Sequence, residues 1–404
     1  MRALLSFLAL ALNLVLITAG AAQAAPPATV AVAFDARSIR PVLAEGEADR
    51  AAHRPVTARD PVRIASISKL VTTLGVLRLV DQRRLELDRD VSDYRGCAVR
   101  NPAFPERKIT LRLLLSHQSS LRDGDDLYII PLGMTLRERL SDPAVWDPDH
   151  APGSGWFHYT NLNFPVVASV MERVTGERFD VLMSRLVLKP LRLDACFNWG
   201  AGCSAEAFRR AVVLYRDSGE IARDDLGGVP PPCPVVVQDG KPCDLSTYRP
   251  GDNGALFSPQ GGLRIAMIDL AKIGQLLARR GAGFLSPHAF AELTRPAWRF
   301  NGRNGLGEDG TASGFFCSYG LALHRIGTGA GGGCHDDLFA DQRRRIGHSG
   351  DAYGLKSGLW VDPATGRGLA YFTTAVAAAA PNGRSAFTAR EETVVERAQA
   401  APFR

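Results

Sequence analysis

The order of strand-like and helix-like segments along this chain limits the folds that it can adopt. Segments rich in β-branched residues predict strands near both ends, at about 28–35, 39–46, 319–326, 344–349, 355–361 and 368–374. Between these ends, from about 85 to 300, the periodicity is mostly helical and is broken by loops rich in Pro and Gly. One sheet must therefore be assembled from both ends of the chain, with a mostly helical domain inserted.

The hydrophobic periodicity also places the helices, which we expect at 66–82, 110–116, 135–141, 161–175, 178–188, 269–280, 287–294 and 384–399. These segments predict an α/β (α+β) fold in which an antiparallel sheet is flanked by helices. Residues 25–84 and 301–404 would form the sheet domain, and residues 85–300 the mostly helical domain.

The first 24 residues have the features of a secretory signal peptide. Arg2 supplies the positive region, Leu4 to Ile17 is almost wholly apolar, and Ala22-Gln23-Ala24 offers small residues for cleavage. An uncleaved signal anchor is the alternative, because the apolar stretch nearly reaches spanning length. No second such segment occurs. We therefore expect a periplasmic or secreted protein without stable membrane insertion after cleavage.

All seven cysteines follow this leader, at positions 97, 196, 203, 233, 243, 317 and 334. Near neighbours suggest the pairs Cys196–Cys203, Cys233–Cys243 and Cys317–Cys334. Six cysteines allow about 15 arrangements, so the sequence does not establish the pairing. Cys97 would remain as a buried, inert thiol. No Cys-x-x-Cys and no helically spaced histidine pair occurs, so we expect neither a metal site nor a cofactor.

The net charge of +6 raises the question of a nucleic-acid partner. The basic residues are spread in small groups, at Arg209-Arg210, Arg279-Arg280 and Arg343-Arg344-Arg345. No stripe of basic residues interleaved with aromatic residues accompanies them. We interpret these groups as solvated surface and expect no nucleic-acid partner.

Only six of the 48 basic residues are lysines, and Lys69 stands three residues after Ser66. At the start of a helix this spacing places a hydroxyl and an amine on one face, one turn apart. A lysine can lose its proton in a protein, whereas an arginine cannot. The pair is therefore a candidate serine nucleophile with its own base. Ser68 is the rival nucleophile, but it lies one residue from Lys69 and points to a different face.

Two further segments could carry chemistry, although each also has an ordinary structural interpretation. In Tyr159-Thr160-Asn161, a phenol could transfer a proton and an amide could bind a substrate amide. Alone, the same segment could be a helix cap beside a core tyrosine. Gly347-His348-Ser349-Gly350-Asp351 lies just before a predicted strand, and a glycine there allows close approach to a ligand. Alone, that segment could be a turn with an exposed histidine.

Taken in order, these segments resemble the motifs of the serine beta-lactamase-like hydrolases, the family of class C beta-lactamases, D-alanyl-D-alanine carboxypeptidases and related esterases. Ser66-Ile67-Ser68-Lys69 is similar to the first motif, Tyr159-Thr160-Asn161 to the second, and His348-Ser349-Gly350 to the third, with His in place of Lys. The segments 114–121 and 259–263 resemble two further landmarks of the family. The resemblance spans about residues 30–375. It implies a beta-lactamase/transpeptidase-like fold with the active site between the sheet domain and the mostly helical domain.

The resemblance implies a role for each matched residue. Ser66 would be the acylated nucleophile, and Lys69 and Tyr159 would share the base and acid work in an order that stays open. The substrate-binding residues would be Asn161, His348, Ser349, Gly350 and Asp351. Of these, His348 would line the far wall of the site, and the N–H groups of Ser66 and Asp351 would form the oxyanion hole.

Two departures from the family pattern bear on the substrate. His348 is expected to be largely neutral near pH 7, whereas a lysine in its place would supply a fixed positive charge. Asp351 adds a negative charge where the family often has a small or neutral residue. Both changes argue against substrates with a free carboxylate at this end, which include penicillins.

We therefore expect an exported serine hydrolase that acts through an acyl-enzyme on an ester or on a D-amino-acid amide or peptide, including ones derived from the cell wall. Two alternatives stay open. One is a beta-lactamase or D-alanyl-D-alanine carboxypeptidase proper. The other is a penicillin- or cell-wall-binding protein that is acylated without turnover. A hydrolase with a Gly-x-Ser-x-Gly elbow is disfavoured because that motif is absent.

Overall fold

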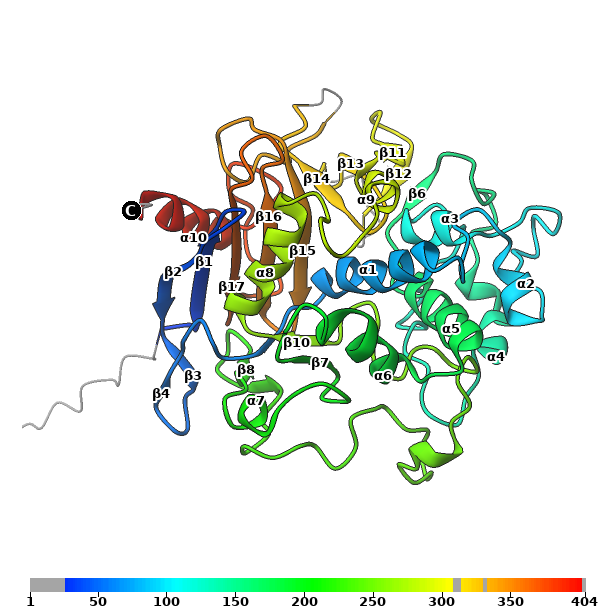
Figure 1. The fold of residues 1–404 in the computed structure, drawn as a ribbon, viewed down its shortest axis with the longest axis horizontal. Helices are drawn as coiled ribbons and strands as arrows, with labels where there is room; N and C mark the ends of the chain where they lie inside the picture. The colour runs from blue at the N-terminus through cyan, green and yellow to red at the C-terminus, as the bar shows by residue number, and fades with distance from the viewer. Residues whose placement is uncertain (1–25, 308–313, 330–332, 402–404) are drawn as a thin grey trace, which may run out of the picture.

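The computed structural model describes residues 26–307, 314–329 and 333–401, so the expected leader at 1–24 lies outside the described residues. Its largest element is an eight-stranded antiparallel sheet (Figure 1). In sheet order the strands are β11 (Trp298–Arg299), β13 (Ser318–Tyr319), β14 (His324–Ile326), β15 (Arg345–Ala352), β16 (Leu355–Val361), β17 (Gly368–Thr373), β1 (Thr29–Phe34) and β2 (Ile39–Glu45).

Some helices lie against this sheet, and most of the others lie to one side of it (Figure 1). They are α1 (Ile67–Asp81), α2 (Val91–Arg95), α3 (Leu111–Leu115), α4 (Leu136–Leu140), α5 (Asn163–Thr175), α6 (Phe179–Met183), α7 (Ala205–Arg209), α8 (Met267–Ala278), α9 (Pro287–Thr294) and α10 (Ala389–Ala400). Shorter strands outside the large sheet are β3 (Glu47–Asp49), β4 (Arg54–Pro55), β5 (Val62–Arg63), β6 (Phe157–His158), β7 (Ala195–Phe197), β8 (Leu214–Tyr215), β9 (Ile221–Arg223), β10 (Leu263–Ile265) and β12 (Gly305–Leu306).

Strand β1 joins the two ends of the chain within the large sheet. It pairs with β2 on one side and with β17 on the other, so that Thr29 lies opposite Thr373 and Phe34 opposite Gly368. This pairing confirms the prediction that the sheet is assembled from both chain ends.

Different helices cover the two faces of this sheet. Because successive side chains of a strand point to opposite faces, Val32 of β1 joins the large core while Ala33 joins a smaller cluster with Val394 of α10. Helix α8 covers the first face, where the Phe34 ring leaves no room for a Cβ at Gly274. Helix α8 lies within the segment 85–300 that we assigned to the helical domain, yet it packs against the sheet. The domain boundaries themselves stay a prediction.

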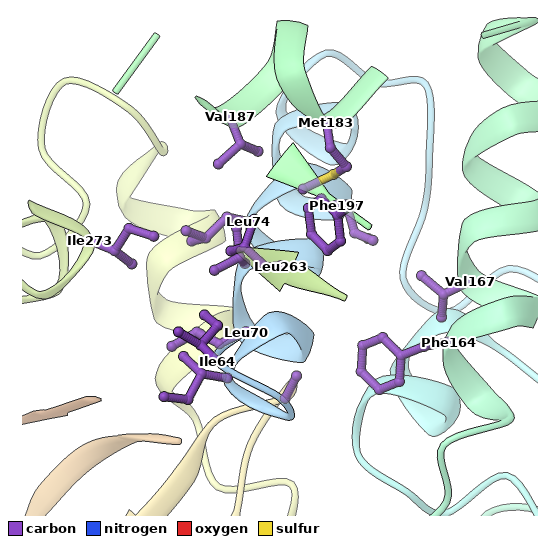
Figure 2. Packing of buried hydrophobic residues seen from close by; sticks show 14 of the residues in the cluster. Ile64, Leu70, Leu74, Phe164, Val167, Met183, Val187, Phe197, Leu263 and Ile273 are labelled. Carbon is purple, nitrogen blue, oxygen red and sulfur yellow. The ribbon is translucent and has the colours of Figure 1, made fainter. Parts of the chain in front are cut away.

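Helix α1 is packed against apolar side chains from several other elements (Figure 2). It is buried on almost all sides, since 12 of its 15 residues are buried. Leu70 and Leu74 lie among apolar side chains from other helices, including Phe164 of α5, Met183 of α6 and Ile273 of α8. A helix enclosed in this way has no solvent-facing stripe, which is typical of a core helix. Its polar side chains must therefore find partners inside the protein.

A small antiparallel sheet holds the chain just before α1. Strand β10 lies between β5 and β7 in this sheet. Past the end of β5, the N–H of Ile64 donates to the carbonyl of Leu263 at 3.0 Å. The entry to α1 is therefore fixed by backbone hydrogen bonds to a segment almost two hundred residues away in the sequence.

Several predicted elements differ from those observed at their ends. The strand predicted at 319–326 is two short strands, because the chain turns at Gly320, whose N–H donates to the carbonyl of Leu323 at 2.8 Å. The helix predicted at 384–399 begins at Ala389, where Thr388 and Glu391 form a capping box. The helix predicted at 178–188 is divided into α6 and a π-helical turn, Ser184–Leu188.

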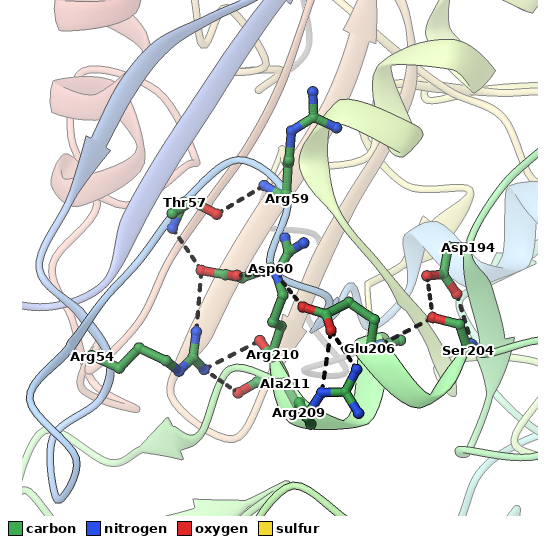
Figure 3. A network of polar contacts seen from close by, with 11 residues as sticks. Arg54, Thr57, Arg59, Asp60, Asp194, Ser204, Glu206, Arg209, Arg210 and Ala211 are labelled. Carbon is green, nitrogen blue, oxygen red and sulfur yellow. Dashed lines mark hydrogen bonds and ion pairs between the residues drawn. The ribbon is translucent and has the colours of Figure 1, made fainter.

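Ion pairs tie α7 to the segment that leads into β5 (Figure 3). The buried carboxylate of Asp60 lies 3.3 Å from Arg54 and 3.0 Å from Arg210, while Arg209 pairs with Glu206 at 2.6 Å. Arg209 is exposed, as expected for solvated surface. Arg210 differs from that expectation, because its guanidinium helps to neutralise a buried carboxylate.

The structure contains three disulfides, Cys196–Cys203, Cys233–Cys243 and Cys317–Cys334. They are the three near-neighbour pairs that the sequence suggested without establishing. Cys97 is free, as expected, but it is half-buried rather than buried. In the part of the chain that the structure describes, no helix has the length and apolar character needed to cross a bilayer.

Titration of thiols tests this pairing. In denatured but unreduced protein we expect one reactive thiol, that of Cys97, and seven after reduction. Replacing Cys97 with Ser should remove the single thiol from the unreduced sample. A count of seven thiols without reduction would contradict the three disulfides.

Candidate active site

Ser66 stands where the small sheet gives way to helix α1. The preceding residue, Ala65, has a left-handed backbone with φ of +46°, and the helix begins directly after Ser66. Such a φ is unfavourable for a residue with a side chain, so the surrounding structure must hold this turn. The first N–H groups of a helix have no intrahelical partners and favour negative charge beside them. The turn thus places the Ser66 hydroxyl at a helix N-terminus.

Lys69 lies one turn further along α1 and is fully buried. Its Nζ donates to Ser66 Oγ at 2.9 Å, to Asn161 Oδ1 at 2.7 Å and to the carbonyl of Gln260 at 3.2 Å. The three donors of the ammonium therefore meet three acceptors. Nζ also lies 4.8 Å from the centre of the Tyr159 ring. The structure thus brings together the first two predicted motifs.

A carboxylate that the sequence did not reveal orients Asn161. Asp123 accepts hydrogen bonds at 2.9 Å from Asn161 Nδ2 and from the backbone N–H groups of Asn161 and Leu162. Because Nδ2 faces this carboxylate, the amide oxygen of Asn161 is turned toward Lys69. Asp123 follows the landmark segment 114–121 by two residues and belongs to no recognised motif. Only the folded chain shows what it does.

The Tyr159 ring is held between two other rings. It stacks on His117 with 4.4 Å between ring centres and on Phe316 with 4.7 Å. His117 is itself fixed, because its Nδ1 accepts from the N–H of Thr160 at 3.0 Å. The sequence analysis included His117 only as part of a landmark segment. The structure shows that it supports the second motif.

Strand β15 carries the third predicted motif past the turn before Ser66. A Cβ at Gly350 would lie 2.3 Å from the carbonyl oxygen of Ile64, so only glycine allows this approach. On the neighbouring strand, Ser357 Oγ donates to the same carbonyl at 3.1 Å. These contacts hold β15 and β16 against the residues that precede Ser66.

His348 does not line the site, in contrast to our expectation. Its side chain is fully buried, with Nδ1 2.6 Å from the carbonyl of Ser349 and Nε2 2.7 Å from the hydroxyl of Tyr319. Because a carbonyl only accepts, Nδ1 carries the hydrogen and Nε2 accepts from the Tyr319 phenol. The side chain of the next residue, Ser349, points to the other face of the strand and borders a pocket. The third motif therefore contributes to the site through Ser349 and Gly350.

The charge of Asp351 is compensated by a residue that the sequence analysis did not consider. Lys356 lies opposite Asp351 in the β15–β16 hairpin, and its Nζ is 2.5 Å from Asp351 Oδ2. The Asp351 side chain is 62% exposed, so solvent screens it as well. The uncompensated anion that we expected beside the oxyanion hole is therefore an ion pair. The pairing depends on hairpin register, which no single-residue pattern reveals.

Two pockets open on either side of Ser66. The first, which we call the Asn161 pocket, has a volume of about 420 Å³ and is lined by Ser66, Asn161 and Gln260 among others. The second, the Tyr159 pocket, has a volume of about 260 Å³ and is lined by Ser66, Tyr159 and Ser349 among others. Asp351 borders both. A carbonyl group at Ser66 could thus place its two substituents in different pockets.

The rival nucleophile and the possible metal ligands are far less suited to catalysis than Ser66 and Lys69. The rival nucleophile Ser68 is fully buried, and its Oγ accepts from the N–H of Leu263 at 3.0 Å. Within the described ranges, no three His, Cys, Asp or Glu side chains are grouped so that they could hold a metal ion.

Three histidines near the site are buried and have lowered pKa values. Burial lowers the pKa of His117 and of His348 well below the usual 6.5, and the nearby charge of Lys69 lowers both further. Burial also lowers the pKa of His324 to about 3. Such residues stay neutral in the folded protein at a pH where the unfolded chain already binds protons.

Comparison with known proteins agrees with this architecture. The family described as Beta-lactamase matches residues 16–392. Esterase EstB of Burkholderia gladioli is 29% identical over 307 residues, which are 67% of this chain and 73% of that protein. The D-alanyl-D-alanine-carboxypeptidase/endopeptidase AmpH of Escherichia coli is 28% identical over 38% of this chain and 40% of its own length. The structure of D-amino acid amidase from Ochrobactrum anthropi SV3 superposes with a TM-score of 0.62 at 18% identity, and covers 93% of both chains.

The pKa of His324 leads to a prediction about stability. As the pH falls below 6.5, the unfolded chain gains a proton on this residue that the folded protein refuses until about pH 3, so stability is lost in that window. Urea unfolding of the wild type and of His324→Phe between about pH 5.5 and pH 4, where the unfolded histidine is nearly fully protonated, should give slopes that differ by about 1.4 kcal/mol per pH unit. Glu172, whose pKa burial raises to about 7, acts in the opposite direction but contributes equally to both proteins. Equal slopes would contradict a neutral, buried His324.

Proposed function

Because the chain belongs to the Beta-lactamase family of serine hydrolases, we propose that it is an exported enzyme that forms an acyl-enzyme at Ser66 with an ester, or with a D-amino-acid amide or peptide. The observation that carries this proposal is the buried Lys69 amine, 2.9 Å from Ser66 Oγ. A serine needs a base within hydrogen-bond reach to become a nucleophile, and this contact supplies one.

The geometry around Lys69 favours this residue as the first base. In the neutral amine form required for catalysis, two N–H groups can remain on Asn161 Oδ1 and the carbonyl of Gln260. The lone pair then points to the third partner, Ser66 Oγ, and can accept its proton. This arrangement supports Lys69 over Tyr159 for the activation of Ser66.

The proposed reaction has two stages. Ser66 Oγ bonds to the substrate carbonyl carbon while its proton passes to Lys69, and the resulting oxyanion is bound by the N–H groups of Ser66 and Asp351. The bond to the leaving group then breaks as Tyr159 donates a proton to the leaving atom, and the proton is restored to Tyr159 from Lys69. In the second stage, the oxygen of a water molecule bonds to the acyl carbon while the same groups take up its proton. The bond between the acyl carbon and Ser66 Oγ then breaks, that proton passes to Ser66 Oγ, and the acid is released.

The two pockets divide the substrate between them. Tyr159 borders the Tyr159 pocket, so a leaving group that receives its proton would depart into that pocket. The acyl part would then occupy the Asn161 pocket, where the Asn161 amide can bind an acyl-side amide when the substrate has one. Phe315, Phe316 and Ala377 give the Tyr159 pocket an apolar part that suits an uncharged leaving group.

The proposed substrate preference for uncharged leaving groups rests on a revised charge argument. Asp351 and Lys356 compensate each other at the Tyr159 pocket, and buried Glu391 also lines it. Burial raises the pKa of Glu391, and its carboxyl group supplies no positive charge whether it is protonated or not. A substrate carboxylate there would meet no net positive charge. Esters and simple amides are therefore preferred to penicillins and cephalosporins.

Export is supported by two independent features. Most of the leader-like segment at 1–24 lies before residue 16, where the family match begins. The chain after this segment carries three disulfides. Disulfides of this kind persist in oxidising compartments such as the periplasm. Fractionation of cells that produce the full chain, with amino-terminal sequencing of the product, would test cleavage at Ala24.

Labelling by an alkyl fluorophosphonate tests the nucleophile. Ser66→Ala should lose the label, whereas Ser68→Ala, which also removes a serine hydroxyl from α1, should keep it. Retention of the label at the wild-type rate in Ser66→Ala would refute the assignment. With a p-nitrophenyl ester, release of many equivalents of p-nitrophenol identifies an enzyme, and a single equivalent identifies a binding protein that does not turn over.

The role of Lys69 leads to a second kinetic prediction. Lys69→Arg keeps a positive charge but removes a group that can lose its proton, so acylation should slow by roughly two or more orders of magnitude. The acylation rate is measured from the p-nitrophenol burst in stopped flow. Near-normal acylation in this variant would transfer the role of base to Tyr159.

The compensated charge of Asp351 can be tested by substitution. Asp351→Asn leaves Lys356 without its partner, so the catalytic efficiency for a cephalosporin, relative to a short-chain ester, should rise roughly three- to tenfold. Asp217→Asn, which removes an exposed carboxylate away from both pockets, serves as the matched control. An unchanged ratio would contradict the charge argument. Efficient cephalosporin hydrolysis by the unmodified protein would instead identify a beta-lactamase.

A further inference from the structure

The wall of the Asn161 pocket contains a guanidinium group that has no carboxylate partner among the residues that the structure describes. Arg63 lines this pocket and is only 5% exposed. Its Nη1 donates to the carbonyl of Gly261 at 2.7 Å and its Nη2 to Asn198 Oδ1 at 3.2 Å, while its Nε has no hydrogen-bond partner. Both acceptors are neutral. A buried cation without an anion is unusual, because burial is costly for an uncompensated charge.

The nearest buried carboxylate is taken by another arginine. Arg264 is 1% exposed, shares Asn198 Oδ1 with Arg63 at 2.6 Å, and pairs with the buried Asp224 at 2.8 Å. Two guanidinium groups and one carboxylate leave one positive charge in this cluster. Burial and the charge of Arg264 lower the pKa of Arg63 to about 9, so an anion beside Arg63 would relieve a real electrostatic cost.

A second arginine extends the positive charge along the same wall. Arg223, at the end of β9, is exposed and lines the Asn161 pocket. The ring of Tyr353 contacts both guanidinium groups, at 5.1 Å from Arg63 and 5.5 Å from Arg223. Stacking on one ring limits the movement of both groups. Both guanidinium groups therefore lie along the same wall of the pocket, that of Arg63 buried and that of Arg223 exposed.

The carboxylates that line this pocket do not cancel that charge. Asp126 and Arg223 are both exposed, so water screens both of these charges, and Asp351 is paired with Lys356. The charge of Arg63 lies in a medium of lower dielectric and is screened much less. The pocket therefore retains a net positive field on the side that we assign to the acyl group.

We propose that the Asn161 pocket selects acyl groups that end in a carboxylate, so that the preferred substrates are monoesters or monoamides of dicarboxylic acids. The distal carboxylate lies against Arg63 and Arg223, and the scissile carbonyl lies at Ser66. A guanidinium offers a carboxylate paired, charge-assisted hydrogen bonds. This inference rests on the proposed function, because the acyl-enzyme determines which part of the substrate enters the pocket.

Two esters that differ in one group test the inference. The p-nitrophenyl monoester of adipic acid and p-nitrophenyl hexanoate have the same leaving group and the same acyl length, but only the first has a distal carboxylate. The ratio of their kcat/KM values should favour the adipate ester by about tenfold or more at low ionic strength, and should fall as salt is added. A ratio of one or below would overturn the inference.

Substitutions assign the preference to the two arginines. Arg63→Gln should bring the ratio close to one, and the exposed Arg223→Gln, which does not disturb the buried cluster, should lower it several-fold. Arg216→Gln removes the same charge from the same β8–β9 hairpin but does not line the pocket, so its ratio should match the wild type. A ratio that persists in both Arg63 and Arg223 variants would overturn the inference, and Arg223→Gln alone decides if Arg63→Gln does not fold.

Failure of the proposed function is distinguishable from failure of this inference. If neither ester acylates Ser66, the hydrolase proposal fails. Calorimetry with Ser66→Ala reads the pocket without chemistry, by comparing monomethyl adipate with methyl hexanoate. Tighter binding of the monomethyl adipate, lost in Ser66→Ala/Arg223→Gln, supports an anionic acyl site. Equal binding of the two compounds refutes it.

Discussion

The buried ammonium of Lys69 is the constraint around which this protein is organised. A charge inside a protein is tolerated only when its hydrogen-bonding capacity is met, and Lys69 has three donors to satisfy. The acceptors come from three distant parts of the chain: the preceding turn of α1, the segment before α5, and the loop before β10. The contacts that satisfy the buried Lys69 amine also bring it close to Ser66 and Asn161.

A second layer of residues holds these groups in place. Asp123 fixes the Asn161 amide through three hydrogen bonds, and His117 supports the Tyr159 ring by stacking. Gly350 allows β15 to lie against the turn before Ser66. None of these residues is proposed to react. They restrict the rotamers of the residues that we propose to react or to bind substrate, and catalysis depends on such prior positioning.

The sequence predicted the parts of this design that are local. The spacing of Ser66 and Lys69, the strands predicted at 28–35, 39–46, 355–361 and 368–374, and the helix from Pro287 to Thr294 follow from short-range periodicity and were found as expected. Contacts between distant segments could not be predicted in this way. The pairing of Asp351 with Lys356 depends on hairpin register, and the role of Asp123 depends on how the segment after α3 packs. We expected the His348 side chain to line the site, but it is buried in the protein. Tertiary packing decides which side of a strand faces a pocket, so the sequence could not predict this.

The position of β1 has a consequence for the order in which the protein folds. This strand is made first, yet Thr29 finds its partner Thr373 across a separation of 344 residues. Contacts of such high contact order close large loops, and they make folding slow. Until β17 has left the ribosome, the edge of β1 that pairs with β17 has no partner strand, and the large sheet is incomplete. The large sheet can therefore be completed only after β17, near the end of the chain, has been synthesised.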